Sequence, residues 1–366
     1  MARELSLSPV RYRDALALDR HMEASARRIV LVTRKDLTPA SVAVLGRAGR
    51  TPFGLIVAAD REALRLRGQE HLLDDLAGID ILERIPGRFD TADLARAARA
   101  CHRRLLRISE ADLRQAIAGR ELHLKYQPKV GRSDGHEWHT SEAEALLRWQ
   151  HPELGWLGPL EFLPELEAFG LMGEVSDFVL AETAAQLVRW RRQGLELDGC
   201  INLASSQLHD PQLAARYADI VGQHGLQCAN FTFEVIEQDI ADSAAPHLRI
   251  LNDLREHGFR ISLDDFGIAA ASLGTLEAIP VDEIKIHAAA LERARQNDIA
   301  QKVLAAVTGL AHNLGISVCA EGVEDTATCE FLDTIGCDKL QGHLISEAVM
   351  PELIQAGYRT KAHAVA

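Results

Sequence analysis

The sequence contains no apolar run long enough to cross a bilayer, and its first residues, MARELSLSPVRYRD, lack the apolar core of a signal peptide. Its six cysteines are scattered without a CxxC pair, so the pattern indicates neither a zinc site nor a disulfide framework. We therefore expect a cytoplasmic protein without membrane insertion, whose thiols are reduced and mostly buried.

Basic residues are scarce in the later two thirds of the chain. The net charge is −13 over 366 residues, and it is unevenly divided: residues 1–110 carry a small positive excess and the remainder a large negative one. This asymmetry predicts separate domains, and the length leaves room for two. The acidic part argues against a nucleic-acid polymer as partner, because such binding depends on neutralising many phosphates with Lys and Arg. A small anionic ligand held through metal ions remains open.

Short apolar runs alternate with longer amphipathic stretches through residues 109–366, which is typical of strand–helix units with a mostly parallel sheet. Helix-like segments such as residues 178–193, 247–258 and 298–315 separate the runs. The candidate strands are ELHLKYQP, SEAEALLRW, GCINL, FTFEVIE, FRISLDD, DEIKI, SVCAE and DKLQGHL. Eight strands over about 250 residues predict an α/β fold, a TIM-like (β/α)8 barrel.

Residues 1–108 form a smaller predicted α/β domain, with strands at RIVLV and FGLIVAAD. The pattern resembles the later part of a bacterial receiver domain, but Thr33 and Ile85 stand where a receiver carries its phosphoacceptor aspartate and a lysine. We therefore predict a regulatory domain that is not phosphorylated and that can bind a protein partner. An unrelated sensory or dimerisation module is an equal alternative. The stretch from Thr91 to Leu122 predicts one or two helices coupling the domains.

Acids and amides follow the apolar runs of the predicted barrel strands, where barrel enzymes place their working residues. Any one alone is ordinary, since an isolated Asp or Glu is most often a helix cap or a solvated side chain. Carboxylates on successive strands, however, repel one another unless a cation neutralises them. Carboxylate and amide oxygens without Cys or an HxxxH pair favour Mg²⁺ or Mn²⁺ over zinc, and two such ions recur in phosphodiester cleavage. The residues are Glu144, Asn202, Glu234, Asp264, Asp265, Lys285, Glu321 and Gln341.

Short motifs connect these residues in a fixed order along the chain. They are YQP (126–128), EALLRW (144–149), INLASSQL (201–208), FEVIE (233–237), DDFG (264–267), VDEIKI (281–286), AEGVE (320–324) and QG (341–342). In this order and approximate spacing they resemble the EAL-domain cyclic di-GMP phosphodiesterases, over about residues 111–352.

The resemblance implies cyclic di-GMP as ligand, two Mg²⁺ or Mn²⁺ ions as cofactors and a homodimer. It implies that the first metal is bound by Glu144, Asn202, Glu234 and Asp264, with Asp265 helping to hold the second. Lys285 and Glu321 match the catalytic positions near the second metal and the water. Arg148 matches a dinucleotide contact, and its charge and planar fork suit a phosphate. The other matched dinucleotide contacts are Gln127, Leu146 and Gln341, and the matched supporting acids are Glu237 and Glu324.

Three stretches depart from the family pattern. After DDFG the family usually continues with a Thr-Gly-Tyr-Ser-Ser-like loop that supports the second metal and couples the site to dimerisation, but residues 268–272 read IAAAS. His287 stands where an aspartate usually follows the lysine, and the sequence from Gly342 reads GHLISEA in place of a GYLF-like ending.

Three functions therefore remain open. The intact metal and lysine set favours an active phosphodiesterase that hydrolyses cyclic di-GMP to linear pGpG. The altered loop and His287 favour a catalytically feeble receptor that binds the dinucleotide and signals through a protein partner. An interaction module that has lost nucleotide binding is disfavoured, because an unused carboxylate cluster has no structural benefit. Product analysis separates the first function from the other two, and metal-dependent binding without turnover identifies the second.

Overall fold

The structure of the chain, a computed structural model, describes most of the region after residue 107 and short parts of the region before it. The chain forms two compact units: residues 1–121 group with 149–169, and residues 122–148 group with 170–366. The predicted boundary between residues 108 and 109 stays a prediction. The described residues are 28–33, 42, 45, 53–58, 82–85, 108–133, 137–152, 154–236, 244–266, 279 and 281–354.

In the first unit, three strands form a parallel sheet in the order β1 (Arg28–Thr33), β2 (Phe53–Ala58) and β3 (Leu82–Ile85). Strands β1 and β2 lie where the sequence predicts them, and Thr33 and Ile85 are the last residues of β1 and β3. The receiver resemblance itself stays a prediction. Residues 91–107 of the predicted coupling helices lie outside the described residues.

The first unit also contains α6 (Glu110–Ala118), β6 (Gly155–Leu157) and α7 (Pro159–Ala168). Helix α6 begins at a capping box, because Ser109 Oγ accepts from the Asp112 amide and the Asp112 carboxylate accepts from the Ser109 amide. This capping gives α6 a defined start just inside the acidic part of the chain.

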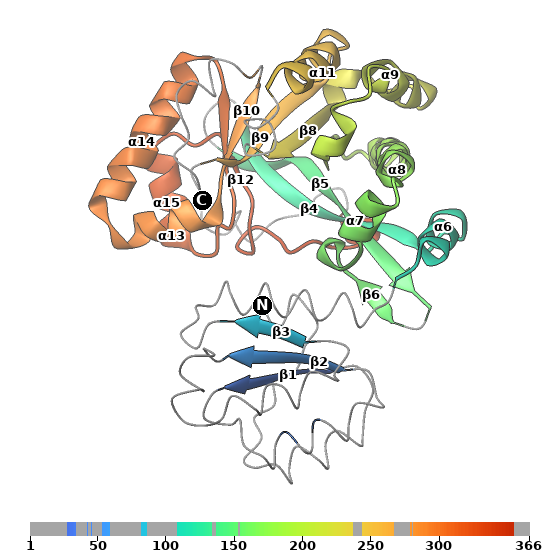
Figure 1. The fold of residues 1–366 in the computed structure, drawn as a ribbon. Helices are drawn as coiled ribbons and strands as arrows, with labels where there is room; N and C mark the ends of the chain where they lie inside the picture. The colour runs from blue at the N-terminus through green and yellow to red at the C-terminus, as the bar shows by residue number, and fades with distance from the viewer. Residues whose placement is uncertain are drawn as a thin grey trace. The chain divides into compact units, whose positions relative to one another are not determined.

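The second unit is built around a closed ring of eight strands (Figure 1). They pair in the order β5-β7-β8-β9-β10-β11-β12-β4, and β4 pairs with β5 to close the ring. Strand β6 pairs antiparallel with the last three residues of β5, Trp149–His151. The pairings from β5 round to β12 are parallel, whereas β4 runs antiparallel to β12. The predicted TIM-like barrel is confirmed, with one reversed strand. The strands are β4 (Leu122–Ser133), β5 (Glu137–His151), β7 (Asp198–Asn202), β8 (Phe231–Ile236), β9 (Arg260–Phe266), β10 (Glu283–Ile286), β11 (Ser317–Ala320) and β12 (Lys339–Leu340).

Helices follow the parallel strands along the chain. The predicted helical segments lie within or overlap α8, α11 and α14, and local polar residues set helix starts: Asn297 accepts from the Ile299 amide at α14, and Asp325 accepts from the Thr328 amide at α15, both at 2.8 Å. None of the helices described is both long and apolar enough to span a membrane. The helices are α8 (Met172–Arg192), α9 (Leu213–Gln223), α11 (Ala244–Glu256), α13 (Ala288–Gln296), α14 (Asp298–Asn313) and α15 (Thr326–Thr334), with short 3₁₀ helices at Ser205–Gln207, Cys228–Asn230 and Pro351–Leu353.

Alternation along the strands divides their side chains between the helix layer and the barrel interior. On β8, the buried ring of Phe233 packs 5.2 Å from Tyr217 of α9 and 5.1 Å from Phe259, centroid to centroid. The next residue, Glu234, instead contacts Lys129 of β4 and Lys285 of β10. The helix-facing side is therefore apolar, and the interior is polar and charged.

This alternation fills the barrel interior with two polar layers. Interior side chains on one strand are two residues apart, so consecutive interior side chains of a strand lie in different layers. We call the layer at the carboxyl ends of the parallel strands the site layer, and it holds Gln127, Glu144, Asn202, Glu234, Asp264, Lys285, Glu321 and Gln341. We call the other the lower layer, and it holds Lys129, Glu142, Cys200, Ser262, Glu283 and Lys339.

Candidate active site

Glu144 of β5 is fixed by two amides of the site layer. The Asn202 Nδ2 group donates to Glu144 Oε1 at 2.8 Å, and the Gln341 Nε2 group donates to Oε2 at 2.6 Å. Burial alone would raise the pKa of Glu144, but Lys285, Lys129 and these hydrogen bonds hold it below the ordinary value. Glu144 therefore stays ionised although it is buried.

A chain of amides continues from Glu144 to the segment after β12. Gln341 Nε2 also lies 3.2 Å from Gln127 Oε1, and Gln127 Nε2 donates to the Ser346 carbonyl at 3.0 Å. The Oε1 atom of Gln341 is buried and has no hydrogen-bond partner among the described residues. A buried acceptor of this kind is costly unless a ligand or water satisfies it.

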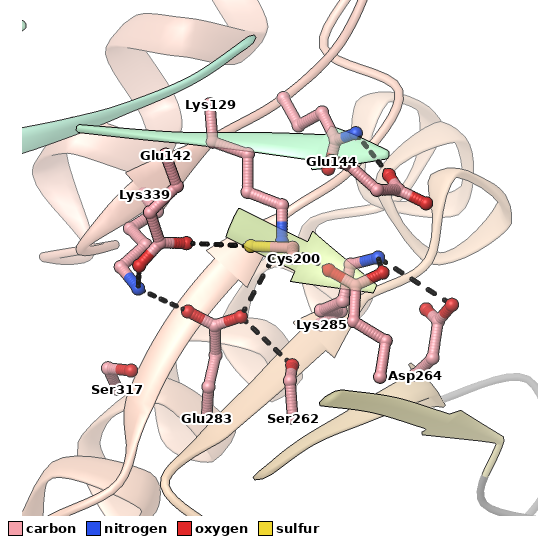
Figure 2. Close-up of polar contacts among 12 residues, drawn as sticks. Lys129, Glu142, Glu144, Cys200, Ser262, Asp264, Glu283, Lys285, Ser317 and Lys339 are labelled. Atoms are coloured by element: carbon pink, nitrogen blue, oxygen red, sulfur yellow. Dashed lines mark hydrogen bonds and ion pairs between the residues drawn. The ribbon is translucent and has the colours of Figure 1, made fainter. Parts of the chain in front are cut away.

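Lys285 of β10 joins three acids in the site layer. Its Nζ atom donates to Glu234 Oε2 at 2.6 Å, lies 3.6 Å from Asp264 Oδ2 and pairs with Glu321 Oε1. Burial would lower the pKa of Lys285, but the acidic neighbours Glu234 and Glu144 raise it well above its ordinary value. Lys285 is therefore a permanent cation at the centre of the layer (Figure 2).

Glu321 follows β11, and its surroundings disfavour the ionised form of its carboxyl group. Burial raises its pKa, Lys285 opposes this, and the neighbouring Asp264 and Glu144 carboxylates raise it further, to about 7. Glu321 can therefore exchange a proton near neutral pH.

Asp264 and Asp265 close the end of β9. Asp265 has a φ of 61°, in the left-handed region, and its amide donates to Asp264 Oδ1 at 2.7 Å. Burial and the neighbouring Asp264 raise the pKa of Asp265. His287 Nε2 lies 3.7 Å from Asp265 Oδ1, while its Nδ1 atom accepts from the Ala289 amide at the start of α13. Because Nδ1 accepts this hydrogen bond, Nε2 is the ring nitrogen that faces Asp265.

The site layer borders a cavity of about 340 Å³, within the usual size range of ligand sites. Its lining comes from β4, β5 and β9 and from the segments that follow β11 and β12, which brings together residues far apart in the sequence. The lining residues are Gln127, Glu144, Leu146, Asp264, Glu321, Gly322, Glu324, Gln341, Gly342 and His343. Asn202, Glu234 and Lys285 are not among them, but each contacts a lining carboxylate or another residue of the layer.

Gly342 allows two segments of the cavity wall to approach closely. A Cβ atom at this position would lie 2.3 Å from the Val323 nitrogen and 2.4 Å from its oxygen. The Val323 amide in turn donates to the Gln341 carbonyl at 3.0 Å. Only glycine fits here, so the position holds the AEGVE and QG segments together.

The donor set of the site layer fits hard divalent cations. Carboxylate and amide oxygens are the ligands that Mg²⁺ and Mn²⁺ prefer, and the layer contains more carboxylates than lysines to neutralise them. Among the residues described, no three His, Cys, Asp or Glu side chains already converge on one point as a ligand set. An ion bound at Glu234 would therefore have to replace its contact with Lys285. The carboxylates of the layer are those of Glu144, Glu234, Asp264 and Glu321; its lysine is Lys285, and Lys129 of the lower layer contacts Glu234.

The family model for the EAL domain matches residues 110–348. The chain belongs to the EAL domain family. Over 244 residues, this EAL chain is 34% identical to a cyclic di-GMP phosphodiesterase of Pseudomonas aeruginosa, a match that covers 66% of this chain and 41% of the relative. Over 246 residues it is 34% identical to the bifunctional diguanylate cyclase/cyclic di-GMP phosphodiesterase MucR of the same organism, covering 67% of this chain and 36% of MucR.

A solved structure resembles the EAL domain in the same way. The PaMucR phosphodiesterase in complex with c-di-GMP matches with a TM-score of 0.61 and 34% sequence identity, and the match covers 66% of this chain and 97% of that one. The chain spans less than half the length of the curated relatives named above.

Some predicted residues of the EAL domain lie away from the cavity. The Arg148 guanidinium donates to the Leu147 carbonyl at 2.8 Å and does not line the cavity. Burial lowers its pKa. Glu237 and the altered loop at 268–272 lie outside the described residues. Their roles, and those of the other predicted site residues, stay predictions.

Two features of the EAL domain were missed by reasoning from the sequence. His343 lines the cavity directly after the Gln341-Gly342 pair, and its place in the altered GHLISEA ending was the available signal. The lower layer was also missed, although the spacing of Glu142 before Glu144 and of Glu283 before Lys285 shows the period of two.

Proposed function

We propose that this chain hydrolyses cyclic di-GMP to linear pGpG with two bound Mg²⁺ or Mn²⁺ ions. The observation that carries the proposal is one cavity that combines the amides of Gln127 and Gln341 with the carboxylates of Glu144, Asp264 and Glu321. Amides can pair with the polar edges of a nucleobase, and carboxylates can bind ions that hold a phosphate. The names of the two Pseudomonas relatives support the same substrate.

The metal ligands in this proposal are the oxygen donors of the site layer. Bound divalent ions would supply an acidified water and charge neutralisation at the phosphate. Asp265, which follows Asp264 at the end of β9 with a left-handed backbone, belongs near the second ion. The ligands of the first ion are Glu144, Asn202, Glu234 and Asp264.

Hydrolysis adds one water across a phosphodiester. The water oxygen forms a bond to phosphorus, the bond from phosphorus to the ribose 3′ oxygen breaks, and a proton from the water ends on that 3′ oxygen. Glu321 lines the cavity beside Lys285, where its carboxylate can accept this proton. Lys285, a permanent cation beside it, stabilises the negative charge that grows on the phosphate oxygens.

A catalytically feeble receptor for cyclic di-GMP is the second candidate. The observation that favours it is His287, which stands where the family usually has an aspartate and whose Nε2 lies 3.7 Å from Asp265 Oδ1. A neutral imidazole supplies no negative charge there, so the second ion is held less strongly while the amides of the cavity still bind the dinucleotide.

The partners and location belong to the same proposal. We propose a homodimer and a protein partner bound through the N-terminal region, both measurable by light scattering and by co-purification. The described cysteines, from Cys200 to Cys337, are free thiols, the form expected in a reducing compartment. A cytoplasmic location is consistent with this.

The decisive experiment incubates the purified chain with cyclic di-GMP and Mn²⁺ and separates the products by chromatography. We expect pGpG from the wild type, none from Lys285→Met, and wild-type amounts from Lys302→Met, which removes an exposed lysine of α14. Dinucleotide binding without product would select the receptor. A chain that neither binds nor cleaves the dinucleotide would overturn both candidates.

A further inference from the structure

A ladder of alternating charges runs through the barrel interior from the site layer to the lower layer. Lys285 contacts Glu234 at 2.6 Å, and the other oxygen of Glu234 contacts Lys129 at 2.5 Å. Lys129 lies 3.9 Å from Glu283, Glu283 contacts Lys339 at 2.7 Å, and Lys339 contacts Glu142 at 2.6 Å. Figure 2 shows Lys129 between the acids of the lower layer and the Lys285–Asp264 pair of the site layer.

Lys129 is tied into this ladder more firmly than an ordinary lysine. Its side chain has no exposed surface, and the reversed direction of β4 places it beneath Gln127 rather than at the cavity. The charge of a buried lysine is tolerated only where acids surround it. Lys129 therefore cannot leave Glu234 for solvent when the contents of the cavity change.

The two oxygens of Glu234 consequently have different surroundings. Oε1 faces down to Lys129, whereas Oε2 faces Lys285, which also contacts Asp264 and Glu321 in the site layer. With Oε1 held from below, the carboxylate plane is fixed and Oε2 points towards the Lys285 amine that an ion bound at Glu234 would have to replace. An ion replacing Lys285 at Oε2 meets a ligand that is already oriented.

We propose that Lys129 is a positioning residue that orients Glu234 for divalent-metal binding. The proposal rests on the metal-dependent function proposed above, and it adds a residue that has no contact with the cavity. Partners that orient a metal ligand typically change metal affinity by about 10–100-fold when they are removed. Lys129 acts from beneath the ligand, through a fully buried contact.

Electrostatics alone predicts the opposite result, which makes the proposal testable. Lys129→Met removes a positive charge near the cation site, so a purely electrostatic or packing role gives Mn²⁺ affinity equal to or tighter than that of the wild type. A positioning role gives weaker affinity, because Glu234 is free to rotate and to pair with Lys285 through both oxygens. The sign of the change therefore separates the two roles.

The experiment is calorimetric titration of the full chain with Mn²⁺. Lys129→Met is expected to weaken binding by about 10–100-fold while cyclic di-GMP binding, measured without divalent ions, changes little. The matched control is Lys339→Met, which removes a largely buried lysine of the lower layer that does not contact Glu234, and we expect it to keep Mn²⁺ affinity. Circular dichroism and thermal unfolding report whether each variant is folded.

The double variant Lys129→Met with Glu283→Gln guards against a failure to fold. It removes one charge of each sign, and Lys339 keeps its contact with Glu142. This variant too must bind Mn²⁺ more weakly. Unchanged or tighter Mn²⁺ binding by a folded Lys129 variant overturns the positioning role while leaving the proposed function standing. A wild-type chain that binds no Mn²⁺ overturns the proposed function and the positioning role together.

Discussion

Two glutamates in the same barrel show how the two layers differ. Glu283 in the lower layer is fully buried and Glu321 in the site layer is partly buried, and burial alone would raise the pKa of each. Lys129, Lys339 and Ser262 outweigh burial at Glu283 and lower its pKa to about 2. At Glu321, burial and the neighbouring Asp264 and Glu144 carboxylates outweigh Lys285, and the pKa rises to about 7.

The difference follows from how each layer balances its charges. In the lower layer the acids Glu142 and Glu283 meet Lys129 and Lys339, and the Ser262 hydroxyl donates to Glu283 at 2.9 Å. The site layer has more carboxylates than lysines and borders the cavity. A balanced layer fixes structure, and a layer with excess negative charge can bind cations.

The largest expected effect compares two acids of β5. Glu144→Gln removes a predicted metal ligand, so Mn²⁺ affinity should fall by at least about 100-fold, beyond the loss typical of an outer-shell partner. Glu142→Gln makes the same change two residues earlier, in the lower layer, and should keep Mn²⁺ affinity but lower the unfolding temperature, because Lys339 loses a charged partner. Calorimetry and thermal unfolding measure the two effects. Equal losses of affinity in both variants would mean that the layers do not have separate roles.

A smaller effect is expected where the cavity wall is tightest. Gly342→Ala puts a methyl group against the Val323 backbone, so the QG segment must shift and Gln341 with it. We expect cyclic di-GMP affinity to fall by about tenfold, or ~1.4 kcal/mol. Gly309→Ala in α14 is the control, since its Cβ meets nothing within 4 Å and alanine favours a helix. Wild-type affinity in Gly342→Ala would show that this wall does not shape the ligand site.

A third effect, on stability rather than on binding, is a pH dependence of opposite sign in the two layers. The depressed pKa of Glu283 contributes stability above pH 4.5, which is lost as the pH falls from 4.5 towards 2. The raised pKa of Glu321 contributes stability that is complete below pH 4.5 and is lost as the pH rises through about 7. Each contribution is on the order of 1–3 kcal/mol.

Urea unfolding of the metal-free chain at several pH values tests this pair. Glu283→Gln should flatten the acid side of the wild-type stability profile, and Glu321→Gln should flatten the side between pH 4.5 and 7. If both variants showed the same pH dependence of stability as the wild type, the proposed difference between the two layers would be contradicted.

The sequence predicts the barrel and most of its site because both depend on local pattern. Apolar runs locate the strands, and the acids at the ends of those runs must gather when parallel strands form a ring. The EAL motifs then connect Glu144, Lys285 and Glu321 across long separations in the chain. The cavity lined by Glu144 and Glu321 shows that this gathering takes place.

Other features depend on pairing that the local pattern does not specify. The apolar pattern ends the first predicted strand at Pro128, yet β4 continues to Ser133. On the edge of β4 that faces β12, Pro128 lies between the pairing of Tyr126 with Val349 and the pairings of Val130 and Gly131 with β12, so no pairing on that edge falls at the proline. A strand that is predicted to end at Pro128 does not include Lys129, so the sequence pattern does not indicate the lower layer on this strand.

The reversed direction of β4 has a consequence for transplanting this chemistry onto other scaffolds. On the parallel strands the deeper residue precedes its site residue by two positions, as Glu283 precedes Lys285, whereas on β4 Lys129 follows Gln127. In a barrel whose strands are all parallel, the deeper side chain of the first strand would instead precede the site residue by two positions. To transfer the site to another barrel, β4 must therefore keep its native orientation, with the lysine beneath Glu234, in addition to the residues that line the cavity.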